Sequence, residues 1–117
     1  MNIENAEEEE QLFRAALEKG LEHFNRQEFH EAYDIWESRW HEEVTEGADL
    51  LQGLLQIAFA FSKIQNGNPK GAEKLLATGR DKLSLYGDEA YGLDISATLV
   101  LVQSWLERLE GPSPDGA

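Results

Sequence analysis

The side chains best suited to acid–base or metal chemistry recur along one predicted helix, residues 28–43. Two imidazoles and two carboxylates are spaced i, i+4, i+7 and i+11 on one stripe of that helix: His30, Asp34, Glu37 and His41. Such groups can bind zinc, manganese or iron. Four ligands on one straight helix, however, span about 16 Å and cannot converge on one ion. Because no Glu-x-x-His pair offers ligands from a second helix, we predict a solvated polar face with no metal and no cofactor.

Two amides form a second constellation, on the most apolar stretch of the chain. Gln52 and Gln56 lie one helical turn apart, where a buried polar side chain needs a hydrogen-bond partner. For Gln52 we predict a capping box with Asp49, three residues earlier. For Gln56 we predict a buried hydrogen bond to Glu37 or to the hydroxyl of Tyr33, which would orient one helix on the other. Glu37 is also the carboxylate to test for acid–base catalysis.

Aromatic side chains follow the apolar face of the predicted helix over residues 28–43. They recur at i, i+4, i+7 and i+11 with an alanine beside them, within a sector of about 100°: Phe29, Ala32, Tyr33, Trp36 and Trp40. This spacing favours core packing over a ligand platform for Trp36. We expect Trp40, near the end of the helix, and Trp105 to be partly exposed.

Hydrophobic periodicity predicts five helices and no strand, over residues 5–25, 28–43, 49–64, 69–85 and 94–110. The third, LLQGLLQIAFAFSKI, is apolar almost all the way round and belongs at the centre of the fold. Asn68 and Pro69 are placed to begin the fourth helix, and residues 87–92 form a loop. We therefore predict one helical domain over residues 1–111 and a disordered tail over residues 112–117.

A weak repeat of 40 residues relates the first two predicted hairpins. Ala32 and Ala72 each lie in the first turns of the second helix of a hairpin. In the first hairpin Gly20, Phe29, Ala32 and Trp36 fall at the glycine, aromatic, alanine and aromatic positions of a tetratricopeptide repeat. We predict an all-α fold, a compact five-helix bundle built from two degenerate tetratricopeptide-like hairpins and a capping C-terminal helix.

The composition limits the kinds of partner that the chain can have. Its 117 residues include no cysteine, and 10 Lys+Arg against 23 Asp+Glu give a net charge of −13. Such an acidic chain repels phosphate backbones and anionic lipid, so we expect no nucleic acid and no membrane as partners. The sequence has no 18-residue apolar run, and we expect no signal peptide and a cytoplasmic protein.

The charge is distributed unevenly along the chain. Residues 1–62 carry −11 and residues 83–117 carry −5, whereas residues 63–82 carry +3. The fourth predicted helix is thus a weakly basic element on an acidic body. This pattern either serves solubility or marks a docking surface for a charged partner or a second copy of the chain.

Three motifs follow one another along the chain, preceded by Phe24 and Asn25. They are EFHEAYDIWESRW at residues 28–40, LLQGLLQIAFAF at residues 50–61 and GNPKGAEKLL at residues 67–76. Together they resemble the domain of unknown function family 309, a group of small prokaryotic proteins, over about residues 17–86. The resemblance implies an all-α bundle with tetratricopeptide-like hairpins, and it implies no assigned activity.

One position departs from the pattern of that family. The family motif in the second helix reads Ala-His-Glu-x-x-Glu, and the matching residues here are Ala32, Tyr33, Asp34 and Glu37. A phenol thus stands where an imidazole could bind metal or move a proton. His30 lies three residues earlier, on a different part of the helix, and does not replace that imidazole.

The sequence supports hypotheses from different functional classes. The first is a non-enzymatic module that binds a protein or small ligand on the concave side of its hairpins, near Tyr33, Trp36, Glu37, Trp40 and Gln56. The alternative is a metal-assisted or acid–base enzyme that uses Asp34 and Glu37. A third hypothesis is a homodimer built on exposed aromatic side chains.

Overall fold

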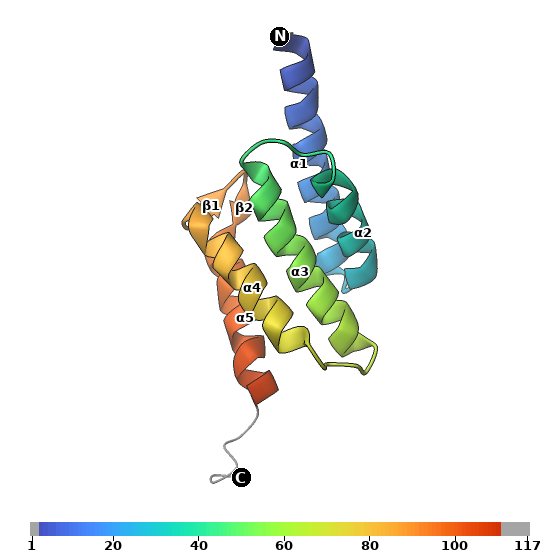
Figure 1. Cartoon of the computed structure of the whole chain (residues 1–117), viewed down its shortest axis with the longest axis vertical. Helices are drawn as coiled ribbons and strands as arrows, with labels where there is room; N and C mark the ends of the chain where they lie inside the picture. The colour runs from blue at the N-terminus through green and yellow to red at the C-terminus, as the bar shows by residue number, and fades with distance from the viewer. Residues whose placement is uncertain (1–2, 111–117) are drawn as a thin grey trace.

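A computed structural model describes residues 3–110, which form a bundle of five helices (Figure 1). The helices are α1 (Ile3–Asn25), α2 (Phe29–Trp40), α3 (Gly47–Gln65), α4 (Ala72–Leu83) and α5 (Ile95–Glu110). A short 3-10 helix, η1 (Ser84–Tyr86), follows α4. The predicted all-α fold is confirmed, and the predicted tail at 112–117 lies outside the described residues. None of the described helices is long and apolar enough to cross a membrane.

Each helix packs mainly on the next one in the chain, so α3 lies between α2 and α4. In the view of Figure 1 these three helices are in front, and α1 and α5 lie behind them. Short connections force neighbouring helices to run antiparallel. The central position predicted for α3 from its apolar sequence follows from this arrangement, because most of its surface meets other helices.

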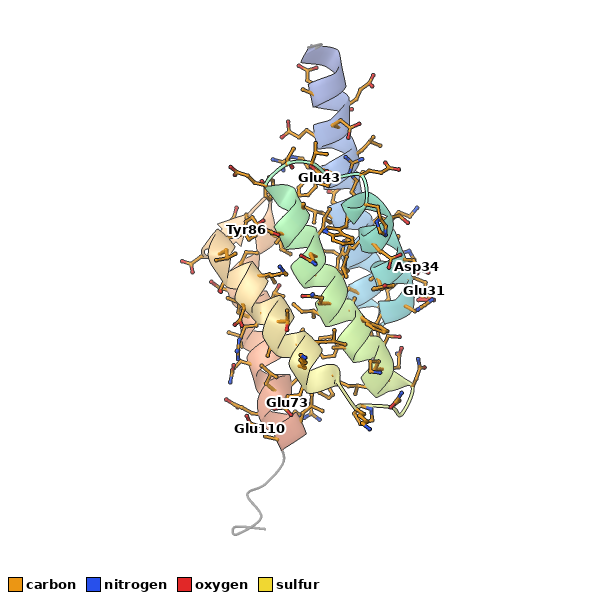
Figure 2. All side chains as sticks on the ribbon, viewed as in Figure 1. Glu31, Asp34, Glu43, Glu73, Tyr86 and Glu110 are labelled. Carbon is orange, nitrogen blue, oxygen red and sulfur yellow. The ribbon has the colours of Figure 1, made fainter. Side chains whose placement is uncertain are left out.

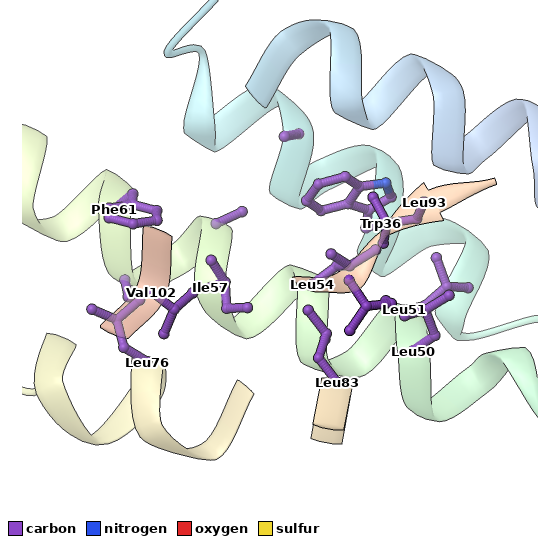
Figure 3. Close-up of a cluster of buried hydrophobic side chains, with 14 of the residues drawn as sticks. Trp36, Leu50, Leu51, Leu54, Ile57, Phe61, Leu76, Leu83, Leu93 and Val102 are labelled. Carbon is purple, nitrogen blue, oxygen red and sulfur yellow. The ribbon is translucent and has the colours of Figure 1, made fainter. Parts of the chain in front are cut away.

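The hydrophobic core gathers around α3 (Figure 3). Its largest fully buried side chains are Trp36, Leu50, Leu51, Ile57, Leu76, Leu83, Ile95 and Val102. The indole of Trp36 lies against Gly20 of α1, where a Cβ would clash with the ring. Its Nε1 donates a hydrogen bond to the carbonyl of Ala16, 3.1 Å away. The prediction that Trp36 belongs to the core is therefore confirmed.

Two glycines bring α3 and α4 together. A Cβ at Gly79 of α4 would lie 2.8 Å from the carbonyl oxygen of Gly53 in α3. It would also lie 2.7 Å from the side chain of Ile57. A larger residue at Gly79 would therefore push the two helices apart, since a packed interior leaves no space for extra carbon atoms.

Helices α1 and α3 end in the same backbone motif, 40 residues apart. In each, two N–H groups beyond the helix donate to carbonyls of its last turn, which is the Schellman arrangement. The four bonds run from Gln27 to Phe24, Glu28 to His23, Gly67 to Ile64 and Asn68 to Lys63. The residue at the turn is left-handed in both motifs, with φ of 63° at Gln27 and 77° at Gly67.

Helix α3 begins two residues before the predicted position. Its first residue is Gly47, so Asp49 lies inside the first turn and the predicted capping box with Gln52 is wrong. The hydroxyl of Thr45 instead accepts a hydrogen bond from the N–H of Gly47, 3.2 Å away. This local bond satisfies one N–H at the start of the helix.

Helices α2 and α4 are shorter than predicted. Helix α2 ends at Trp40 rather than at residue 43. Helix α4 begins at Ala72 rather than at Pro69, because Gly71 takes a left-handed conformation with φ of 86° that interrupts a helix. The N–H of Ala72 donates to the carbonyl of Pro69, 2.9 Å away, which closes the turn.

The prediction of no strand is wrong for the segment before α5. Strands β1 (Glu89–Ala90) and β2 (Leu93–Asp94) pair antiparallel, with Ala90 opposite Leu93. The two residues between them have positive φ, 54° at Tyr91 and 81° at Gly92, as two-residue hairpins require. Asp94 then caps α5, because its carboxylate accepts a hydrogen bond from the N–H of Ala97, 2.9 Å away.

The two Schellman turns form a matched pair that tests the cost of left-handed backbone. Glycine takes this conformation without strain, whereas glutamine does not. We expect Gln27→Gly to raise the free energy of unfolding by about 0.5–1 kcal/mol and Gly67→Gln to lower it by a similar amount. Urea denaturation measures both. Changes of equal sign in the two variants would contradict this account.

Candidate functional site

Tyr33 and Glu37 are joined by a hydrogen bond one turn apart on α2. The Tyr33 hydroxyl donates to Oε2 of Glu37, and the phenol ring lies beside Phe59 of α3, with ring centroids 5.3 Å apart. The hydrogen bond, followed by burial and the negative charge of Glu37, raises the pKa of Tyr33 to about 12. The Tyr33 phenol therefore keeps its proton well above neutral pH.

The predicted hydrogen bond from Gln56 to Glu37 or Tyr33 is not formed. Those two residues bond to each other instead. Oε1 of Gln56 is buried, and no donor among the described residues reaches it. Gln52, Gln56 and Phe59 follow the partly exposed side of α3 at i, i+4 and i+7. The two amides thus form a polar stripe, with one unsatisfied acceptor in it.

Asp34 and Glu37 engage different partners. Oδ2 of Asp34 lies 3.5 Å from Nε2 of His30, and both side chains are largely exposed. Figure 2 shows Asp34 and Glu31 at the outer edge of α2. Within residues 3–110, no group of three or more histidine, aspartate and glutamate side chains lies close enough to hold a metal ion.

A buried arginine that the sequence did not single out connects α1, α2 and the loop after α2. Arg39 is 7% exposed, and its Nε donates to Oε1 of Glu43 at 2.9 Å. The Glu43 side chain is 3% exposed, and its other oxygen accepts from the Thr45 hydroxyl. Nη2 of Arg39 reaches Glu9 of α1. Arg39 and Glu43 are the buried pair of this network, and removing one partner of a buried pair typically costs about 3–5 kcal/mol. We therefore assign the network a structural role.

An apolar groove lies on the other side of α3, between α1 and α5. Two adjoining pockets of about 400 Å³ and about 180 Å³ form it. Phe24 of α1, Phe61 of α3 and Trp105 of α5 line the larger pocket, and Leu101 borders both pockets. Phe61 packs edge-on against Phe24 and Trp105, with ring centroids 5.7 Å and 5.6 Å apart. Helices α1, α3 and α5 thus share one aromatic surface, to which Phe29 of α2 also contributes.

The larger pocket has a polar end, where the two Schellman turns meet. Asn25, Gln27 and Gln65 line it there. Nε2 of Gln65 donates to the backbone carbonyl of Gln27, 2.9 Å away. These groups offer amide hydrogen bonds and no formal charge, so the groove as a whole is suited to an uncharged, mainly apolar surface.

The residues predicted for the site fall mostly outside this groove. Trp36 borders the smaller pocket from within the core. The other predicted residues lie elsewhere on α2 and on the partly exposed side of α3: Tyr33, Asp34, Glu37, Trp40, Gln52 and Gln56. Trp40 and Trp105 are partly buried, as predicted.

Sequence reasoning missed Phe24, Leu101 and Trp105 as groove residues. A signal for α5 was present in its sequence, because Thr98, Leu101 and Trp105 follow a second stripe beside the buried Val102. When the apolar sector of a helix is wider than one neighbouring helix can cover, the uncovered part either packs against a second neighbour or stays exposed. In this protein the second sector forms one wall of the groove.

The fold and the groove define a class of protein, an all-helical bundle of antiparallel hairpins with an apolar cleft. Residues 17–75, about half of the chain, match the family described as Domain of unknown function (DUF309), and the chain belongs to that family. No curated protein and no solved structure matches the chain. The family match ends within α4, so α5 and its wall of the groove lie outside it.

The raised pKa of Tyr33 makes stability depend on alkaline pH. The folded chain keeps the phenolic proton up to about pH 12, whereas the unfolded chain releases it near its ordinary pKa of 10.0. The free energy of unfolding therefore falls as pH rises from about 10 to about 12. We expect Tyr33→Phe to lose less stability over this range than the wild type, measured by urea denaturation. Equal losses in the two proteins would contradict the assignment.

The unsatisfied oxygen of Gln56 predicts a stabilising substitution. Methionine has a similar length and no oxygen to leave unpaired, so we expect Gln56→Met to raise the free energy of unfolding by about 1 kcal/mol. Gln52→Met, one turn away on the same stripe, is the control and should change stability by less than about 0.5 kcal/mol. Chemical denaturation measures both. A destabilised Gln56→Met variant would show that the amide has a partner.

Proposed function

We propose that the protein is a non-enzymatic interaction module whose groove between α1, α3 and α5 binds a protein segment. The observation that carries this proposal is the aromatic groove itself, with Leu101 at 38% exposure on its wall. Exposed apolar surface of this kind, rimmed by polar groups, is typical of interaction sites.

The shape of the groove favours a helix over a compact small molecule. Residues that line its α5 wall run from Ala97 to Trp105, which corresponds to about 12 Å or two helical turns. An amphipathic helix places apolar side chains at i, i+3, i+4 and i+7 over such a length. Small-molecule sites rely on convergent polar groups, whereas the polar groups here gather at one end of the larger pocket.

The polar side chains that could support chemistry do not open into this groove. Glu37 accepts the Tyr33 hydroxyl, and Asp34 pairs with His30 at the surface. These groups bond to near neighbours on the same helix, which is what a solvated structural face requires. Their arrangement supports a binding role rather than an acid–base one.

Leu101 and Val100 provide a matched pair of variants for this proposal. Peptides selected from a displayed library of helical sequences serve as the probe, at about 1 µM protein. We expect Leu101→Glu to weaken their binding at least tenfold, because a carboxylate enters an apolar contact. Val100→Glu changes a neighbouring side chain that is 70% exposed and borders neither pocket of the groove, and it should leave binding within about twofold.

Fluorescence anisotropy of labelled peptides measures both effects, and circular dichroism checks that each variant is folded. Failure to select any helical peptide would overturn the proposal. Selected peptides that bind both variants equally would also overturn it, because their site would then lie outside the groove.

A further inference from the structure

Helix α5 carries an exposed apolar side with no helix after it among the described residues. Its buried side packs mainly on α4, while Val100 and Leu101 are 70% and 38% exposed. Leu101 and Trp105 face the groove. The helix is therefore the natural boundary at which another element can extend the bundle.

One stripe of α5 is self-complementary about Leu101. Asp94 precedes Leu101 by seven residues and Arg108 follows it by seven, so an acid and a base stand at equal distances from the centre. The small residues Ala97 and Thr98 precede Leu101 by four and three, and Ser104 and Trp105 follow it by three and four. At 100° per residue the members from Ala97 to Arg108 fall on one side of α5, and Asp94 stands at its N-terminus as the cap.

A second copy of this stripe, running antiparallel to the first, places complementary residues opposite each other along its length. With a two-fold axis at Leu101, the two leucines meet at the centre and each Thr98 lies opposite the other copy's Trp105. Each Asp94 lies opposite the other copy's Arg108. Small residues thus face a large one, and opposite charges face each other at both ends.

We propose that the partner at the groove is a second copy of this chain, docked through antiparallel pairing of α5 with α5. The inference rests on the proposed function, because it names the helix that occupies the proposed site. A chain with a net charge of −13 repels its own copies, yet this stripe carries one acid and one base and is locally neutral. Self-association is therefore directed to α5 and away from the acidic surfaces.

The two charged ends are positioned for this contact. One oxygen of Asp94 caps α5 through the N–H of Ala97, which leaves the second oxygen for a partner. The guanidinium of Arg108 lies 4.2 Å from the centre of the Trp105 ring, so the arginine is held over the aromatic surface. Both groups are exposed and lie at the edge of the stripe, where charges set register more than affinity.

The oligomeric state at increasing concentration tests the proposal directly. We expect the wild type to form a dimer in sedimentation equilibrium, and Leu101→Glu to be monomeric at about 50 µM, because two carboxylates would meet at the axis. Val100→Glu is the matched control and should dimerise as the wild type does. A monomeric wild type, or a dimer that Leu101→Glu leaves intact, would overturn the proposal.

Charge reversal tests the antiparallel register. Arg108→Glu alone places acid opposite acid at both ends, and Asp94→Lys alone places base opposite base, so each should weaken its own dimer about tenfold. A mixture of the two variants restores an attractive pair at each end. Native mass spectrometry should therefore show the mixed dimer in excess over both homodimers. A statistical mixture would overturn the register.

The outcomes separate this inference from the proposed function. A wild type that stays monomeric while selected peptides bind in a Leu101-dependent manner would overturn the second-copy assignment and leave the groove as a site for another chain. If Leu101→Glu changes neither dimerisation nor peptide binding, both proposals fail.

Discussion

The indole of Trp36 lies directly on the backbone of α1 at Gly20, where there is no room for a Cβ. This contact sets the separation of α1 and α2, and the bond from Nε1 to the carbonyl of Ala16 fixes the orientation of the ring. The same indole borders the smaller pocket of the groove. The position of α1 relative to α3 therefore depends on how the Trp36 side chain packs. The groove between α1 and α5 depends in turn on that position.

Much of the fold could be predicted from the sequence because its helices are strongly periodic. The apolar stretch from Leu50 to Ile64 identified the central helix, and the 40-residue repeat is reflected in two matching helix ends at Gln27 and Gly67. The errors lie at boundaries set by single backbone conformations. Gly71 delays α4, and the positive φ of Tyr91 produces a hairpin where only a loop was predicted.

The candidate site was harder to predict because it depends on which helix faces meet in space. The spacing of Tyr33 and Glu37 allowed them to bond within one helix, and that local bond took precedence over the predicted one to Gln56. The pairing of Arg39 with Glu9 spans 30 residues and follows no short-range pattern. The groove is assembled from α1, α3 and α5, whose sequences do not show that they converge.

The order of packing along the chain also has a consequence for folding kinetics. Because each helix contacts mainly its neighbours in sequence, the loops that must close before native contacts form are short. Helical proteins with such local contacts fold in microseconds to milliseconds. We expect α3 to pack with α2 and α4 first, since it contacts both. Helices α1 and α5 would then pack onto this three-helix unit.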